Sequence, residues 1–245
     1  MVIHTQATSP PPQKIDLDKL LGFLGFGNPR AATVFIGMEE GLSPDPPLRE
    51  QLTARSKFPK LIGLKESSDA HADRFLLAER PAVQSTWNIM IRVLLAIEGR
   101  HTPSLDEIRA YQRDRLGAVG SDAALLELMP LPAPRLPEWP YAEIVEVAER
   151  FPTRAEYMDS QLTVRIEALR EHLAYSPKLT IAYGSAYWPY YKQIFRGVSN
   201  WQRRGVFEVA TLGPQTIILT PHFVARQMNG QRGALIDLAL GAQAV

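Results

Sequence analysis

The pattern of apolar and polar positions predicts helices and strands that alternate along the chain. Five short apolar runs, several rich in β-branched residues, indicate buried strands over 32–36, 125–129, 179–183, 206–210 and 216–219. Apolar residues at helical spacing predict helices over 15–26, 84–98, 158–173 and 228–240, with another after residue 186. Such alternation is typical of an α/β fold, and we expect a three-layer α/β/α arrangement around a mainly parallel central sheet.

Prolines divide the chain into segments. Residues 1–14 hold three consecutive prolines at 10–12, and we expect a disordered lead-in there. Residues 15–245 are long enough for a single large domain. Within it, residues 42–80 are polar and are interrupted by Pro44, Pro46, Pro47 and Pro59. Because a connection this long inside a domain usually has a function, we interpret it as a lid or insertion.

The composition excludes several kinds of site. The chain has no cysteine, so it contains no disulfide, no thiolate zinc site and no cysteine-ligated iron–sulfur cluster. The five histidines, His4, His71, His101, His172 and His222, are scattered without metal-ligand spacing. No signal peptide is visible, and no apolar run approaches the ~18 residues of a membrane span. We therefore expect a cytoplasmic monomer that binds no metal, cofactor or membrane.

Positive charge is concentrated between Tyr187 and Arg232. This stretch has six basic residues and one acid, Glu208, so it carries +5 although the whole chain carries +1. Aromatic side chains lie among these bases, including Tyr187, Trp188, Tyr190, Tyr191 and Trp201, a pattern that suits a polyanion with stackable bases. A solvated face over ordinary core aromatics would give the same pattern. The six basic residues are Lys192, Arg196, Arg203, Arg204, Arg226 and Arg232.

Three loops follow predicted strands directly, which is where parallel α/β sheets bind their ligands. In the first, Gly37 and Gly41 flank Glu39. The second leads from Glu127 into a proline-rich exit, and the third contains His222. Taken alone, the first loop could be explained by a solvated charge, the second by a rigid exit from the strand and the third by a structural histidine. Their equivalent positions at the ends of separate strands favour one shared site.

In this order the loops resemble the motifs of the uracil-DNA glycosylase superfamily, closest to its single-strand-selective monofunctional branch. That branch has Gly-Met-Asn-Pro-Gly first, an Asn two residues before Cys-Pro-Leu second, and His-Pro-Ser last. The corresponding sequences here are Gly37-Met38-Glu39-Glu40-Gly41, Glu127-Leu128-Met129-Pro130-Leu131 and His222-Phe223-Val224. The resemblance covers roughly residues 30–240. It implies a DNA glycosylase that hydrolyses the N-glycosidic bond of a damaged or deaminated base in base excision repair.

The resemblance also implies roles for individual residues. Glu39 would orient the attacking water and stabilise a cationic sugar, and His222 would donate a hydrogen bond to the departing base. The base would contact Gly37, Met38, Gly41, Glu127, Met129 and Pro130, with Phe58 or Phe75 as a stacking ring. Phe223 and Met228 would wedge into the DNA stack, and phosphates would meet Arg226, Arg232, Arg203, Arg204 and Lys192.

The motifs also depart from the family pattern. Glu39 and Glu40 stand where that branch has Asn and Pro, and Phe223 replaces the proline after the histidine. Glu127 replaces the Asn that reads the edge of uracil. An ionised carboxylate only accepts hydrogen bonds, whereas an amide donates and accepts. We therefore expect weak activity on uracil, or activity on a different damaged base.

Two alternatives remain open at this stage. A catalytically inactive nucleic-acid-binding domain on the same fold would keep the basic, aromatic stretch and would need neither Glu39 nor His222. A hydrolase for the N-glycosidic bond of a small nucleotide would use the same carboxylates, and its binding would depend little on salt. A Rossmann-type nucleotide enzyme is disfavoured, since neither GxGxxG nor the phosphate-binding GxxxxGK[ST] is present.

Overall fold

A computed structural model describes residues 14–42, 45–71, 82–135 and 138–243. It is an α/β protein with one eight-stranded mixed sheet, ordered β3-β1-β4-β2-β5-β8-β7-β6. The strands are β1 (Gly25–Gly27), β2 (Thr33–Gly37), β3 (Leu61–Ile62), β4 (Ala123–Glu127), β5 (Leu179–Tyr183), β6 (Gln202–Arg204), β7 (Phe207–Leu212) and β8 (Gln215–Thr220). The helices are α1 (Leu17–Gly22), α2 (Leu48–Arg55), α3 (Leu64–His71), α5 (Ser85–Ile97), α6 (Leu105–Asp114), α7 (Val145–Ala148), α8 (Arg154–His172), α9 (Trp188–Ile194) and α10 (Arg232–Gly241). Short 3₁₀ turns cover Leu173–Tyr175, Ser185–Tyr187 and Arg226–Met228.

The four central strands, β4, β2, β5 and β8, are parallel to one another. Towards the edges, β1 runs antiparallel to β4, while β7 and β6 continue the sheet as antiparallel strands beyond β8. The expectation of a mainly parallel sheet therefore holds for the centre, and the sheet as a whole is mixed. Because the four central strands share a direction, their carboxyl ends meet at one edge of the sheet.

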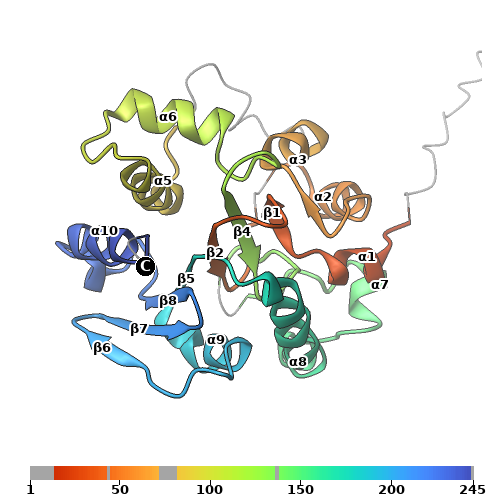
Figure 1. Cartoon of the computed structure of the whole chain (residues 1–245). Coiled ribbons are helices and arrows are strands. Elements are labelled where there is room, and N and C mark those ends of the chain that lie inside the picture. The colour runs from red at the N-terminus through yellow and green to blue at the C-terminus, as the bar shows by residue number, and fades with distance from the viewer. Residues whose placement is uncertain (1–13, 43–44, 72–81, 136–137, 244–245) are drawn as a thin grey trace, which may run out of the picture.

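Hydrophobic clusters cover both faces of the sheet, and strand residues alternate between them. In β2, Val34 and Ile36 belong to the cluster under α8 and α9, whereas Phe35 belongs to the cluster under α5 and α10. This period of two is the one that a strand buried on both faces requires. Figure 1 shows the resulting layers, with α5, α6 and α10 on one side of the sheet and α8 and α9 on the other.

The predicted helix over 15–26 is wrong in its second half. The helix α1 ends at Gly22, and Gly25–Gly27 forms β1 against β4. Gly25 and Gly27 have φ angles of +145° and +109°, and a Cβ on either would collide with a carbonyl oxygen of β4. Only glycine permits this close approach of the two backbones, so the glycines that looked like a helix end are part of the sheet.

Three further segments differ from the sequence expectation. The strand expected over 125–129 is β4 at Ala123–Glu127, two residues earlier. The segment 42–80 contains α2, β3 and α3 in its described part, and β3 extends the sheet; the sequence did not predict these elements. The helix α6 was missed, although Ser104 and Glu107 form a capping box that announces its start.

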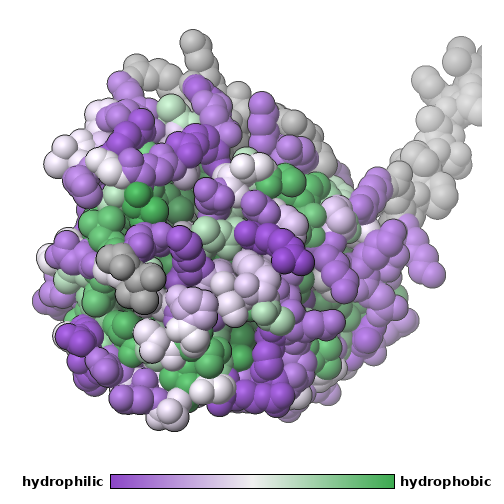
Figure 2. Space-filling view, in the orientation of Figure 1, coloured by the Kyte–Doolittle hydropathy of each residue, from purple (hydrophilic) through white to green (hydrophobic). Residues whose placement is uncertain are grey.

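None of the described helices is long and apolar enough to cross a membrane. On the face shown in Figure 2, hydrophobic residues are visible only in patches between polar ones.

The contact of β1 with β4 gives a first prediction. Gly25→Ala places a methyl group against the β4 backbone, where the Cα of Leu126 is only 2.9 Å from the new carbon. We expect this substitution to lower the free energy of unfolding by about 2–4 kcal/mol in urea denaturation. Gly22→Ala is the matched control, because nothing lies within 4 Å of its new carbon. Equal stability of the two variants would contradict the placement of β1.

Candidate functional site

A pocket of about 370 Å³ lies at the carboxyl ends of the four parallel strands. Glu39 follows β2, Tyr183 is the last residue of β5, and His222 follows β8 by two residues. All three line the pocket, and its position at this edge of the sheet agrees with the expectation from the sequence. Its other lining residues are Met38, Ala133, Arg135, Gly184, Ser185, Ala186, Tyr187 and Ala225.

The loops after β2 and β4 continue to pair beyond the sheet. The amides of Leu128 and Met129 donate to the carbonyl oxygens of Gly37 and Met38 at 2.9 and 2.6 Å. Farther out, the Ala133 amide donates to Glu40 and the Leu42 amide donates to Ala133. The two motifs that carry the carboxylates are therefore one hydrogen-bonded unit, so the backbone around Glu39 is fixed by the loop after β4.

A buried arginine of α8 fixes the exit of β4. Arg165 is 1% exposed, and its guanidinium donates to the carbonyl oxygens of Leu128, Leu21 and Glu127 at 3.0, 3.2 and 2.8 Å. Burial lowers the pKa of Arg165 to about 10, which leaves the group charged at neutral pH. Its donors are thus used by the main chain, and they tie α1, β4 and α8 together beneath the pocket.

Glu39 is held by Arg154, the first residue of α8. One nitrogen, Nη2, lies 2.8 and 2.9 Å from the two oxygens of Glu39, and the Glu39 side chain is only 6% exposed. Burial raises the pKa of Glu39, and the hydrogen bond and charge of Arg154 oppose that rise. The other nitrogen, Nη1, is buried without a hydrogen-bond partner among the described residues. Arg154 therefore brings an unused donor to the site.

Sequence reasoning missed Arg154. The capping box of Thr153 and Glu156 marks where α8 begins, but no local pattern shows that its first residue faces Glu39, 115 positions earlier. The neighbouring carboxylate, Glu40, pairs with Arg55 of α2 at 2.5 Å, and that arginine side chain is 7% exposed. Each glutamate of the first motif thus has its own guanidinium.

Glu127 lies beneath the pocket and is not among its lining residues. The residue is 9% exposed, and its Oε2 has no hydrogen-bond partner among the described residues. Its Oε2 and the Tyr183 hydroxyl both lie against Gly37, where a Cβ would collide with each. The expectation that Glu127 contacts the ligand directly is therefore not met, whereas the adjacent Tyr183 does line the pocket.

The surroundings of the Glu127 carboxyl group favour its protonated form. Burial raises its pKa well above the ordinary value, and the nearby carboxylates of Glu40 and Glu39 raise it further, against the opposing charges of Arg55 and Arg165. A neutral carboxyl group has one hydroxyl donor as well as acceptor oxygens. The objection that Glu127 can only accept hydrogen bonds therefore does not apply to its protonated form.

His222 lies at the mouth of the pocket as a neutral ring. Partial burial lowers its pKa below the ordinary value. Its Nδ1 accepts a long hydrogen bond, 3.5 Å, from the amide of Val224, which leaves the hydrogen on Nε2. The ring packs edge-on against Tyr183, with centroids 5.5 Å apart. The histidine can therefore donate one hydrogen bond from Nε2 to a ligand.

Several expected contact residues lie elsewhere. Phe58 is 7% exposed and packs against Phe23 in the core, because the segment after α2 returns to the sheet, so it is no stacking ring for the pocket. Met129 and Pro130 are buried outside the pocket lining, and Gly41 pairs with Ala133. Phe75 lies outside the described residues. Of the expected base contacts, Met38 alone lines the pocket directly, and Gly37 lies next to Tyr183.

The expected DNA contacts also change. Phe223 and Met228 are each 2% exposed, and Phe223 packs between Phe35 and Tyr183, so neither is a surface wedge. Val224 is instead 57% exposed, directly after the histidine and Phe223. The sequence shows two adjacent apolar residues, Phe223 and Val224, in this loop. It does not show which of them faces the solvent.

The basic stretch is divided by the fold. Lys192 pairs with Glu208 at 2.5 Å and lies over the Trp201 ring. Arg203 and Arg204 are exposed on the edge strand β6, which β7 separates from β8. Arg226 and Arg232 follow His222, and Arg232 lines a smaller pocket with Val224 and Ala225. Only these last two bases are close in the chain to the candidate site.

Metal ligation has no support among the residues that the structure describes, where no group of three or more His, Asp or Glu side chains could hold a metal ion.

A comparison with models of known protein families gives no match, and a comparison with curated protein sequences gives none.

The proton on Glu127 gives a second prediction. Its pKa is higher in the folded than in the unfolded protein, so the folded state binds more protons and loses stability as pH rises above 4.5. Glu127→Gln removes this penalty, and we expect the variant to gain stability relative to the wild type between pH 4.5 and pH 8 in urea denaturation. Glu143→Gln, at an exposed position, is the control. A difference that does not change with pH would contradict a neutral Glu127.

Proposed function

We propose that this protein hydrolyses the N-glycosidic bond of a damaged or deaminated base in DNA. The observation that carries the proposal is the convergence of Glu39, Tyr183 and His222 on one pocket at the strand ends, with the buried Glu127 beneath it. The order of the three loops and their resemblance to uracil-DNA glycosylase motifs support the same assignment. The volume of about 370 Å³ lies at the lower end of the range for small-ligand pockets and suits a single base.

The reaction needs three contributions from the pocket. As the bond from C1′ to the base nitrogen breaks, its electron pair leaves with the base, and the sugar acquires positive charge. The Glu39 carboxylate stabilises this charge and takes a proton from the water that attacks C1′. His222 donates from Nε2 to a carbonyl oxygen of the base, where negative charge develops; such a positioned group contributes about 10²–10⁴-fold.

Arg154 tunes the carboxylate. Burial alone favours the protonated form of Glu39, and the guanidinium 2.8 Å away favours the ionised form. Its unpartnered Nη1 is a further donor for the departing base or for a phosphate beside it.

Tyr183 contributes its hydroxyl at the pocket floor, and this hydroxyl lies beside the Glu127 carboxyl group against Gly37. A tyrosine hydroxyl both donates and accepts hydrogen bonds. A floor that both donates and accepts suits the lactam edge, N–H beside C=O, which uracil and hypoxanthine share. The ring of Tyr187, which also lines the pocket, is the candidate surface on which the base stacks.

One observation favours the inactive alternative. Both oxygens of Glu39 are already engaged by Arg154, as in a structural ion pair. In a nucleic-acid-binding domain without catalysis this ion pair would not impair function, whereas in a glycosylase one oxygen of Glu39 must turn towards water. The two functions therefore predict different effects of substituting Glu39 and His222.

Excision assays test the proposal. Single- and double-stranded oligonucleotides carrying uracil, hypoxanthine or xanthine would be incubated with the wild type, Glu39→Gln and His222→Gln. We expect an abasic product from at least one base and a loss of about 10²-fold or more in either variant. Glu143→Gln and His101→Gln, at exposed positions, should retain full activity. Salt-sensitive binding without product would support the binding domain, and neither binding nor product would refute both.

The exposed Val224 gives a separate prediction. A side chain that fills the gap left by an extruded nucleotide matters in a duplex, where the gap must be held open, more than in a single strand. We expect Val224→Ala to reduce excision from double-stranded oligonucleotides at least about fivefold more than from single-stranded ones. The matched control is Val119→Ala, since Val119 is 52% exposed at another surface position. An equal reduction of excision from both substrates would show that Val224 does not fill the gap left by the extruded nucleotide.

A further inference from the structure

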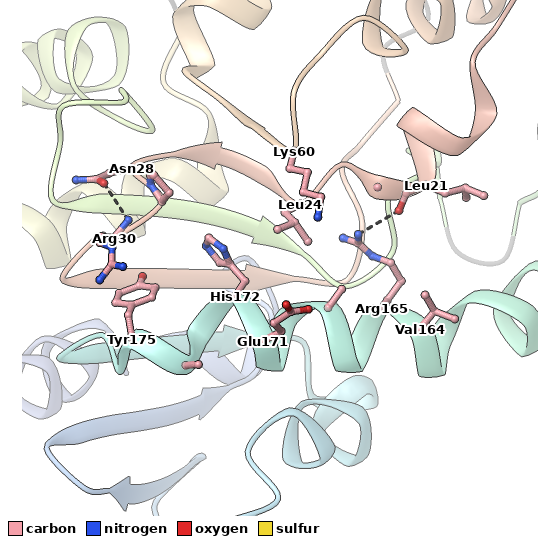
Figure 3. Close-up of a pocket in the computed structure, with 14 residues that line it drawn as sticks. Leu21, Leu24, Asn28, Arg30, Lys60, Val164, Arg165, Glu171, His172 and Tyr175 are labelled. Carbon is pink, nitrogen blue, oxygen red and sulfur yellow. Dashed lines mark hydrogen bonds between the residues drawn. The ribbon is translucent and has the colours of Figure 1, made fainter.

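A second cavity, a groove of about 860 Å³, lies between α8 and the segments that flank β1 (Figure 3). It is distinct from the strand-end pocket, because the two share no lining residue. Its volume falls within the range of about 300–1,000 Å³ that is typical of small-molecule sites. The lining consists of Leu21, Gly22, Leu24, Asn28, Pro29, Arg30, Lys60, Val164, Arg165, Ala168, Glu171, His172, Ala174 and Tyr175.

Two bases stand on the sheet side of the groove. Lys60 precedes β3, and Arg30 lies in the turn between β1 and β2; both are exposed. Neither forms an ion pair within the described part of the chain. Arg165 lines the same groove, but its donors are used by three carbonyl oxygens. Two cations are therefore available here for an anionic ligand.

The helix side carries complementary polar groups. Figure 3 shows Glu171 and His172 on α8, with Tyr175 just beyond its end. The Nε2 of His172 has no hydrogen-bond partner among the described residues. Burial and the charge of Lys60 lower the pKa of His172, so the ring is neutral without a ligand. Glu171 is exposed and forms no ion pair with any described residue, which leaves a carboxylate free to accept hydroxyl hydrogens.

Flat and apolar surfaces complete the groove. Leu21 and Leu24 are buried at 8% and 5% exposure. The Tyr175 hydroxyl donates to the Ala31 carbonyl at 3.0 Å, which fixes its ring, and the His172 ring packs edge-on against it. A ligand with an aromatic portion can therefore lie between the leucines and these two rings.

We propose that this groove binds a nucleotide, with the phosphate at Lys60, the sugar hydroxyls at Glu171 and the base between Leu24 and the rings of His172 and Tyr175, where Arg30 lies beside Tyr175. A nucleotide is the ligand class that combines an anionic group, vicinal hydroxyls and a flat ring at this size. The proposal does not depend on glycosylase activity, since none of these residues belongs to the strand-end pocket.

Calorimetric titration tests the site. Adenosine 5′-monophosphate, adenosine and inorganic phosphate would each be titrated into the full chain. We expect the nucleotide to bind with a submillimolar Kd and more tightly than either of its parts. Lys60→Gln should weaken its binding about tenfold, the effect of one charge-assisted hydrogen bond, and His172→Gln should weaken it as well. Lys65→Gln, outside the groove, should leave the Kd unchanged.

Four results would each overturn the proposal. The nucleotide fails to bind at millimolar concentration, or Lys60→Gln binds it as the wild type does. Phosphate alone binds as tightly as the nucleotide, which would make the groove a simple anion site. Tyr187→Ala, in the strand-end pocket, abolishes nucleotide binding while Lys60→Gln does not, which would place the nucleotide at the other site.

Discussion

Three carboxyl groups lie close together at the ends of β2 and β4, in a region where like charges cannot all be ionised. Glu39 has Arg154 as its partner and Glu40 has Arg55, each at hydrogen-bonding distance. Glu127 has no such partner among the described side chains, because the donors of Arg165 are spent on carbonyl oxygens. Of the two acids, these surroundings therefore favour the proton on Glu127 and the charge on Glu39.

The fold maintains this arrangement through the main chain. The loops after β2 and β4 pair with each other, and Arg165 ties the exit of β4 to α1 and α8. Main-chain hydrogen bonds and Arg165 thus fix the backbone around the buried acids on α1, β4 and α8. In this arrangement Glu39 faces the pocket and Glu127 lies beneath it. We therefore expect folding stability and the state of the site to respond to the same protonation.

Much of the framework follows from the sequence. The apolar runs of β2, β5 and β8 and the helical spacing in α5 and α8 predict those elements, and the strand-end rule brings Glu39 and His222 to one pocket. Local patterns could not reveal Arg154 or Arg55, whose partners lie far along the chain or on another element. They also could not tell a buried aromatic ring from an exposed one in a loop, as Phe58 and Phe223 show. The proton on Glu127 depends on burial, which only the assembled structure determines.

The central claim is that a neutral Glu127 supports recognition at the pocket floor while an ionised Glu39 serves the chemistry. The direct measurement is the pH dependence of single-turnover excision, compared between the wild type and Glu127→Gln. Above the raised pKa of Glu127 its carboxyl ionises and loses its donor, so the wild-type rate should fall as pH increases, whereas the glutamine variant should stay active and lose that high-pH decline. Identical pH profiles for the two proteins, or a variant inactive at every pH, would contradict the account.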